Sequence, residues 1–420
     1  MATLLKKQML VYADWVGLEQ PLLMGYLHAT SVRGKESFSF EYTKAWLQSG
    51  FSQTIDPDLQ LFSGTFFPND NKPNFGMFLD SCPDRWGRTL MQRREALLAK
   101  QESRPIRTLM ESDYLLGVYD ETRMGGLRFK TNQDGPFLND QKGMAAPPWT
   151  SLRELENACL KFELDASINT SMSKWLNMLI APGSSLGGAR PKANVVDAKG
   201  ELWIAKFPSK NDQKDIGAWE MVVNQLAKSA GLNVAQGQLL KLNSQYHTFL
   251  SKRFDRTKNK QRIHFASAMT MLGYSDGDAA SGASYLELME FIFRNGANIE
   301  SDLEELWKRI VFNISVSNTD DHLRNHGFLL KENGWNLSPA YDLNPNEFGT
   351  GLSINITENA NYLDLSLAIE IAPYFKISET KLNRTIKKIK TTVSDWQKVA
   401  SSYKIPKAEQ ERMKPAFSNH

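Results

Sequence analysis

The chain has 420 residues, 41% of them hydrophobic and 23% charged, and its 50 basic and 47 acidic side chains give a formal net charge of +3. This length and composition predict a globular protein with more than one hydrophobic core, and they exclude a chain that is disordered throughout. The near balance of charge excludes nucleic-acid binding by bulk charge, so any contact with DNA would have to be local.

The cysteines and the amino terminus indicate the cellular compartment. Only 2 cysteines occur, Cys82 and Cys159, which are too few for a disulfide framework or a four-ligand zinc site and are typical of a reducing cytosol. The segment MATLLKKQMLVYADW has too short an apolar run for a secretory signal, and no run of 18 or more apolar residues occurs anywhere. We therefore expect a cytoplasmic protein that binds no membrane.

The first 130 residues alternate strand patterns with a helical one. Strands are predicted in QMLVYADWV, LLMGYLH and SFSFEYT, and a helix is predicted in RTLMQRREALLAKQ. The following segment, TNQDGPFLNDQKGMAAPP, is rich in turn formers and indicates a linker. Residues 1–135 are therefore predicted to form an amino-terminal α+β domain.

The middle of the chain, residues 149–254, has a mixed pattern. A capping box predicts a helix from Ser151 to about Leu164, and a glycine-rich turn, GSSLGG, comes some twenty residues later. Two strand patterns, KANVV and ELWIAKF, precede the helical IGAWEMVVNQLAKSA, which Gly231 is expected to end. Further strands are predicted in QGQLLKLN and YHTFLSKRF.

Residues 255–420 are dominated by helical patterns: SYLELMEFIFRNG, DLEELWKRIVFNISV and KLNRTIKKIKTTVSDWQKVA. The basic residues of KLNRTIKKIK alternate with apolar ones, which is typical of the solvated face of an amphipathic helix; local contact with DNA is the alternative. The predicted fold class is α+β, with the amino-terminal domain followed by a mixed small lobe and a mainly helical large lobe.

A short acidic motif is the first candidate for chemistry. In NTDDHLRN, Asp320 and Asn325 are five residues apart, the spacing of the catalytic aspartate and the metal-binding asparagine of protein kinases, whereas Asp321 has the wrong spacing. Asp342 follows a turn seventeen residues after Asn325, where a kinase has its second metal-binding carboxylate. One carboxylate and one amide oxygen are sufficient protein ligands for Mg²⁺.

Candidates for binding the nucleotide lie upstream. Lys206 ends a predicted strand, which can direct its ammonium toward phosphate, and Glu220 in the next helix can pair with it; a helix-dipole role is the alternative for Glu220. The adjacent Gly187 and Gly188 lack Cβ atoms, so their backbone N–H groups can approach phosphate closely.

Several separated motifs together resemble the HipA family of toxin kinases. SSLGGARPKA is similar to the phosphate loop of that family, LWIAKFP to its nucleotide-lysine strand, LSKRFDR to its hinge, and SNTDDHLRNHGFLL with PAYDLNP to its catalytic and metal loops. VYADWVG, GMFLDSCPDRWGR and LLGVYDETRMGGLRF resemble the domain that precedes the kinase in full-length members. The resemblance extends from about residue 10 to at least residue 345.

The resemblance implies a role for each matching residue. Asp320 would be the catalytic base, Asn325 and Asp342 would bind Mg²⁺, and Glu220 would pair with Lys206. The residues implied to bind ATP are Gly187, Gly188, Ala189, Arg190, Pro191, Lys192, Lys206, Lys252, Arg253, Phe254, His322 and Arg324. Lys252 stands where some members have an acidic residue, so the backbone of the hinge matches better than its side-chain contacts.

Family members phosphorylate a serine at the entry to the phosphate loop, and this implies autophosphorylation at Ser185 or at the adjacent Ser184. The added charge would repel the phosphates of ATP. The resemblance further implies a toxin that phosphorylates an aminoacyl-tRNA synthetase or another translation protein and is neutralised by a helix-turn-helix antitoxin, with operator DNA bound only through that complex. Two alternatives remain: a kinase with another substrate, and a catalytically weak binding module or co-repressor acting with the antitoxin.

Overall fold

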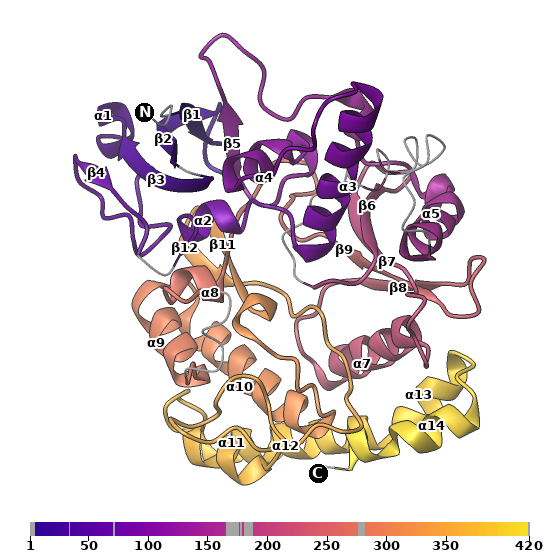
Figure 1. Ribbon diagram of the computed structural model, residues 1–420. Coiled ribbons are helices and arrows are strands. Elements are labelled where there is room, and N and C mark those ends of the chain that lie inside the picture. Colours follow the sequence, from indigo (N-terminus) through magenta and orange to yellow (C-terminus); the bar gives the residue numbers. More distant parts are fainter. Residues whose placement is uncertain are drawn as a thin grey trace. The chain divides into compact units, whose positions relative to one another are not determined.

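The computed structural model describes residues 5–32, 34–69, 72–164, 188–275 and 282–418, together with Leu176 and Leu179 (Figure 1). The chain divides into two compact units. The first comprises residues 1–205 and 255–266, and the second comprises residues 206–254 and 267–420. Antiparallel strands and many helices make up the chain, so the predicted α+β class is confirmed.

The first unit is built on a five-stranded sheet with the strand order β4-β3-β2-β1-β5. The predicted strands form, and β1 pairs antiparallel with both β2 and β5. In β3 the alternating residues Phe38, Phe40 and Tyr42 are buried, since side chains two apart share one face of a strand. The strands of this sheet are β1 (Leu5–Ala13), β2 (Leu22–Val32), β3 (Lys35–Tyr42), β4 (Thr65–Phe66) and β5 (Leu127–Lys130).

Helices and three further strands complete the first unit. Its longest helix, α3, begins after Asp84, whose carboxylate accepts a hydrogen bond from the backbone N–H of Gly87 at 2.8 Å and so caps the helix. The predicted strands KANVV and ELWIAKF are β6 and β7, neighbours in a sheet. The bounds are α1 (Lys44–Leu47), α2 (Gly76–Leu79), α3 (Arg85–Gln101), α4 (Glu111–Gly117), α5 (Leu152–Leu164), β6 (Lys192–Val196), β7 (Leu202–Lys206) and β10 (His264–Ser267), with short 3₁₀ turns at Asp120–Thr122, Lys142–Met144 and Trp149–Ser151.

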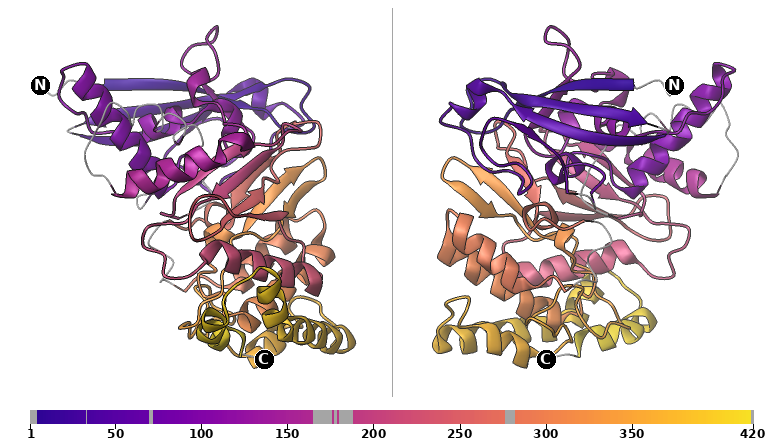
Figure 2. Two further views of the ribbon diagram at one scale, coloured as in Figure 1. Left: turned by 90° about the vertical axis from the view of Figure 1, so that its right-hand side faces the viewer. Right: turned by 60° about the vertical axis from the view of Figure 1, so that its left-hand side comes forward.

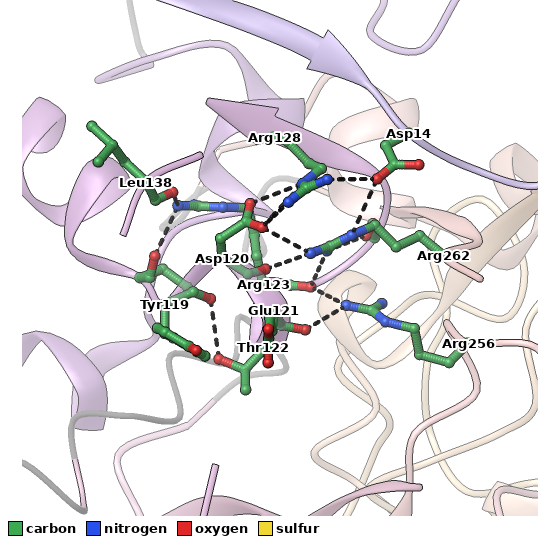
Figure 3. A network of polar contacts seen from close by, with 12 residues as sticks. Asp14, Tyr119, Asp120, Glu121, Thr122, Arg123, Arg128, Leu138, Arg256 and Arg262 are labelled. Atoms are coloured by element: carbon green, nitrogen blue, oxygen red, sulfur yellow. Dashed lines mark hydrogen bonds and ion pairs between the residues drawn. The ribbon is translucent and has the colours of Figure 1, made fainter. Parts of the chain in front are cut away.

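A network of buried and half-buried charges joins residues 255–266 to the rest of this unit (Figure 3). Arg128 donates hydrogen bonds to the carboxylates of Asp120 and Asp14, and Arg262 donates to the backbone oxygen of Asp120 at 2.6 Å. Asp255 accepts a hydrogen bond from the backbone N–H of Gly125 at 2.9 Å. These contacts make a segment from the second half of the sequence part of the first core.

The second unit contains the helix that the sequence predicts after Lys206. This helix, α7, begins after Asp215, which caps it, and ends at Gly231, whose φ of 91° is the left-handed conformation expected for a terminating glycine. β8 and β9 pair antiparallel, and β11 and β12 form a hairpin. The bounds are α7 (Ile216–Ala230), β8 (Gly237–Leu240), β9 (Thr248–Lys252), β11 (Gly327–Lys331) and β12 (Gly334–Leu337).

Helices α9, α11 and α12 pack against α10, whose Trp307, Ile310 and Ile314 are fully buried. The C-terminal helices, yellow in Figure 2, lie beside α7 and α10, since α12 packs against both and α13 packs against α7. The pattern KLNRTIKKIKTTVSDWQKVA is helical, as predicted, and it forms two helices that are separated at Asp395. The bounds are α8 (Ala268–Met271), α9 (Tyr285–Asn295), α10 (Ile299–Ser315), α11 (Leu365–Ile371), α12 (Glu379–Ser394), α13 (Trp396–Ser402) and α14 (Lys407–Met413), with 3₁₀ turns at Leu323–Asn325 and Lys414–Phe417. Among the described residues, no helix combines the length and apolar character needed to span a membrane.

Candidate functional site

Lys206 is the residue around which the candidate site of the second unit is arranged. Its Nζ lies 2.6 Å from Oε1 of Glu220 and 2.6 Å from Oδ1 of Asp342. Lys206 is the last residue of β7 and Glu220 lies in the second turn of α7, so a strand and a helix hold the pair. Burial works to lower the pKa of Lys206, but the carboxylates of Asp342 and Glu220 outweigh it and raise that pKa. The ammonium is therefore charged at neutral pH.

Asp342 has a backbone conformation that is uncommon for residues other than glycine. Its φ is 58°, in the left-handed region that costs a non-glycine residue on the order of 1 kcal/mol. Its carboxylate also accepts a hydrogen bond from Nδ2 of Asn344 at 3.0 Å, and the backbone N–H of Asn344 donates to Oδ1 of Asn318 at 3.2 Å. The segment after Asp342 is thus joined to the loop that contains Asp320.

Asp320 is exposed, and Nδ2 of Asn325 donates a hydrogen bond to its backbone oxygen at 2.9 Å. Partial desolvation raises the pKa of Asp320, the carboxylates of Asp342 and Asp321 raise it further, and His322 opposes them. The influence of Asp342 indicates that the two loops share one electrostatic environment.

The side-chain oxygen of Asn325 is a candidate metal ligand. This Oδ1 is buried and accepts no hydrogen bond from any described residue, which leaves it available as a ligand. In the described part of the chain, no three His, Cys, Asp or Glu side chains cluster as a metal site. One amide oxygen and the Asp342 carboxylate nevertheless fit Mg²⁺, which keeps several water or phosphate ligands.

Asp321 is the centre of a buried cluster. Its spacing from Asn325 excluded it as the catalytic aspartate. Its Oδ2 lies 2.9 Å from Nε2 of His326, accepts a hydrogen bond from Nδ2 of Asn313 at 2.7 Å, and is hydrogen-bonded to the Tyr285 hydroxyl. Asn313 and Tyr285 come from α10 and α9. The cluster therefore attaches the loop beside Asp320 to two helices, a role that spacing along the chain could not indicate.

The phosphate-loop candidates belong to the first unit, and Ser184, Ser185 and Gly187 lie outside the described residues. Gly188 has a φ of 93°, as close approach of backbone to a ligand requires. Lys192 is buried, with its Nζ 2.9 Å from Oδ2 of Asp84. Ala189 is exposed, Arg190 is half-buried and Pro191 is buried.

The hinge candidates lie in the second unit at the end of β9. The backbone N–H of Lys252 donates to the oxygen of Gln236 at 2.9 Å, and Arg253 is buried. The Phe254 ring lies 5.4 Å from that of Tyr341, whose hydroxyl donates to the backbone oxygen of Arg324 at 2.6 Å.

His322 is half-buried, and its Nδ1 has no hydrogen-bond partner among the described residues. Protein kinases hold nucleotide phosphates and metal with a strand lysine that is paired with a helix glutamate, an aspartate–asparagine loop and a second carboxylate. The second unit contains each of these groups: Lys206 with Glu220, the loop from Asp320 to Asn325, and Asp342.

Comparison with known proteins defines the family. The chain matches the family model of the HipA-like C-terminal domain over residues 184–396, slightly more than half of its length. The chain therefore belongs to the HipA family, as its motifs predict.

Two relatives and one solved structure support this assignment. The serine/threonine-protein kinase toxin HipA of Shewanella oneidensis is 25% identical over 337 residues, which cover 73% of this chain and 70% of the relative. A Haemophilus influenzae protein with a provisional kinase name is 26% identical over 180 residues, which cover 38% of this chain and about half, 52%, of that protein. The solved complex of Shewanella oneidensis HipA, HipB and operator DNA contains a chain with the same fold, at a TM-score of 0.67, 18% identity and coverage of 98% of this chain and 96% of that one.

Proposed function

We propose that this chain is an ATP-dependent serine/threonine protein kinase of the HipA type. The observation that carries the proposal is the position of the Lys206 ammonium, 2.6 Å from both the Glu220 and the Asp342 carboxylates. A kinase needs both carboxylates near this lysine, one to hold it and the other to hold the metal beside the phosphates. The kinase names of the relatives support the same activity.

In the proposed reaction a serine or threonine hydroxyl attacks the γ-phosphorus of ATP, the bond to the β–γ bridging oxygen breaks, and ADP leaves. Asp320 orients the hydroxyl and accepts its proton; its raised pKa makes it a better acceptor than an ordinary aspartate. Lys206 holds the phosphates with the backbone of residues 187–192. Asn325 and Asp342 would hold Mg²⁺, which neutralises phosphate charge when bound. The hinge residues Lys252–Phe254 would contact the adenine.

We further propose that the protein acts as a toxin in the cytoplasm, with a translation protein such as an aminoacyl-tRNA synthetase as its substrate. The name of the Shewanella relative is that of a toxin, and the solved complex of its system contains HipB and operator DNA. A helix-turn-helix antitoxin would be the partner of this chain, and DNA would be bound through that partner. Autophosphorylation at Ser185, or at Ser184, would switch the kinase off.

The test is incubation of dephosphorylated protein with labelled ATP and Mg²⁺, followed by mass spectrometry of the labelled residues. We expect label on the wild type, none on Asp320→Ala, and label that moves off the loop in Ser185→Ala. Glu332→Ala serves as a matched control, because Glu332 is exposed in the β11–β12 turn. Absence of both label and ATP binding in the wild type would contradict the proposal and favour the binding-module alternative.

A further inference from the structure

The C-terminal segment, residues 407–417, is attached to the helix that contains Glu220. Glu409 of α14 is buried, and its Oε1 accepts hydrogen bonds from the backbone N–H of Asp215 at 3.0 Å and from Nε1 of Trp219 at 2.7 Å. Asp215 is the capping residue of α7, and Trp219 directly precedes Glu220. One carboxylate therefore holds the first turns of α7 at two points.

Aromatic packing strengthens this attachment. The Trp396 and Phe417 rings stack with centroids 4.5 Å apart and planes 9° apart, and the Trp219 ring lies 6.0 Å from the first and 6.1 Å from the second. Trp219 is only 1% exposed, so α7 has little freedom to rotate without breaking this group. Helices α13 and α7 lie side by side (Figure 1).

The same segment also contacts the loop that contains Asp320. The hydroxyl of Ser317 donates a hydrogen bond to the backbone oxygen of Ala416 at 2.9 Å. Ser317 has a φ of 48°, an unfavourable conformation that the surrounding contacts must hold, and it precedes Asp320 by three residues. The C-terminal segment thus contacts α7 near Glu220 and the chain near Asp320, two parts that are about a hundred residues apart in sequence.

We propose that the C-terminal segment positions the kinase site of this chain, and that Glu409 is a positioning residue acting through α7 on the Glu220–Lys206 ion pair. This inference deepens the proposed kinase function and rests on it. The physical reason is that Glu220 is the neighbour of a residue that Glu409 binds directly, and a small shift of α7 changes the distance between Glu220 and Lys206.

The first experiment is independent of catalysis. Hydrogen exchange of the full chain is compared for the wild type, Glu409→Ala, Glu409→Gln and the control Glu411→Ala, whose side chain is exposed on the same helix. We expect exchange about tenfold faster in residues 216–230 and 313–322 of Glu409→Ala, with α9 unchanged. Glu409→Gln should keep the exchange rates of the wild type, because the amide oxygen of glutamine can still accept both hydrogen bonds. Unchanged exchange in α7, or an equal rise in α9, would overturn the inference.

The second experiment tests the path through Glu220 with a double-mutant cycle. For magnesium-dependent phosphoryl transfer we expect Glu409→Ala to lower kcat/KM for ATP about tenfold in the wild type but less than about twofold in Glu220→Gln. Equal losses in both backgrounds would overturn the inference. A wild type that transfers no phosphate would instead contradict the proposed function, and the exchange experiment would still decide whether the C-terminal segment holds α7.

Discussion

The buried carboxylate of Asp321 lies 2.9 Å from Nε2 of His326, while the neighbouring carboxylate of Asp320 is exposed. Two adjacent aspartates thus have opposite surroundings. One is suited to hold the loop in place, and the other is suited to meet a substrate.

Replacing Asp321 should therefore cost stability. Burial works to raise the pKa of Asp321, but the charge of His326 and the hydrogen bonds from His326 and Tyr285 lower it below its ordinary value. We expect Asp321→Ala to lower the free energy of unfolding by about 3 kcal/mol at pH 7, because buried donors lose their acceptor. Since a lowered acid pKa stabilises the fold only while the group is charged, the deficit should shrink as the pH falls through that pKa. Urea denaturation of Asp321→Ala and Asp320→Ala as a function of pH measures this, and an equal loss in both variants would contradict it.

The stability effect of Asp320 should have the opposite dependence on pH. Its pKa is raised, first by desolvation and then by the Asp342 and Asp321 carboxylates, so its protonated form favours the folded state. Wild-type stability should decrease as the pH rises from the ordinary value of 3.8 through the raised pKa. We expect Asp320→Asn to have a higher Tm than the wild type at pH 7, and the difference to vanish at pH 3. A difference in Tm that is independent of pH would refute this assignment.

Lys206→Met should abolish most of the proposed phosphoryl transfer. The substitution removes the ammonium, so the carboxylates of Glu220 and Asp342 lose their positively charged partner. We therefore expect kcat to fall by about 10²-fold or more. Lys206→Arg should not restore activity, because a planar guanidinium cannot take the place of a compact ammonium between two carboxylates. Lys199→Met, in the exposed turn between β6 and β7, is the matched control and should retain wild-type rates.

Arg262 should contribute strongly to the stability of the first unit. It is buried, and it donates hydrogen bonds to the backbone oxygen of Asp120 at 2.6 Å and to the Asp120 carboxylate at 3.4 Å (Figure 3). Arg262→Met should lower the unfolding free energy by about 3 kcal/mol, since it leaves Asp120 with fewer donors in a buried site. Lys260→Met, two residues earlier and exposed, should change it by less than about 0.5 kcal/mol. Comparable denaturation midpoints for the two variants would show that the network is dispensable.

Much of the fold could be predicted because its elements have local signals. The alternation in β3 and the capping of α7 by Asp215 and Gly231 depend on residues that are close in the chain. The break between α12 and α13 at Asp395 could not be predicted, because the apolar pattern continues across it and tertiary packing decides where the helix ends.

The sequence alone determined the spacing of Asp320 and Asn325, the strand position of Lys206 and the motifs of the HipA family, because each is a property of nearby residues. Only the tertiary structure placed Lys206 against Asp342, 136 residues away, and buried Asp321 between His326 and Tyr285. It also brought Glu409 of α14 into contact with Trp219 of α7, which is 190 residues away in the sequence. Such pairs depend on how distant segments pack. A local pattern in the sequence therefore cannot predict which of the many polar side chains will meet in the interior.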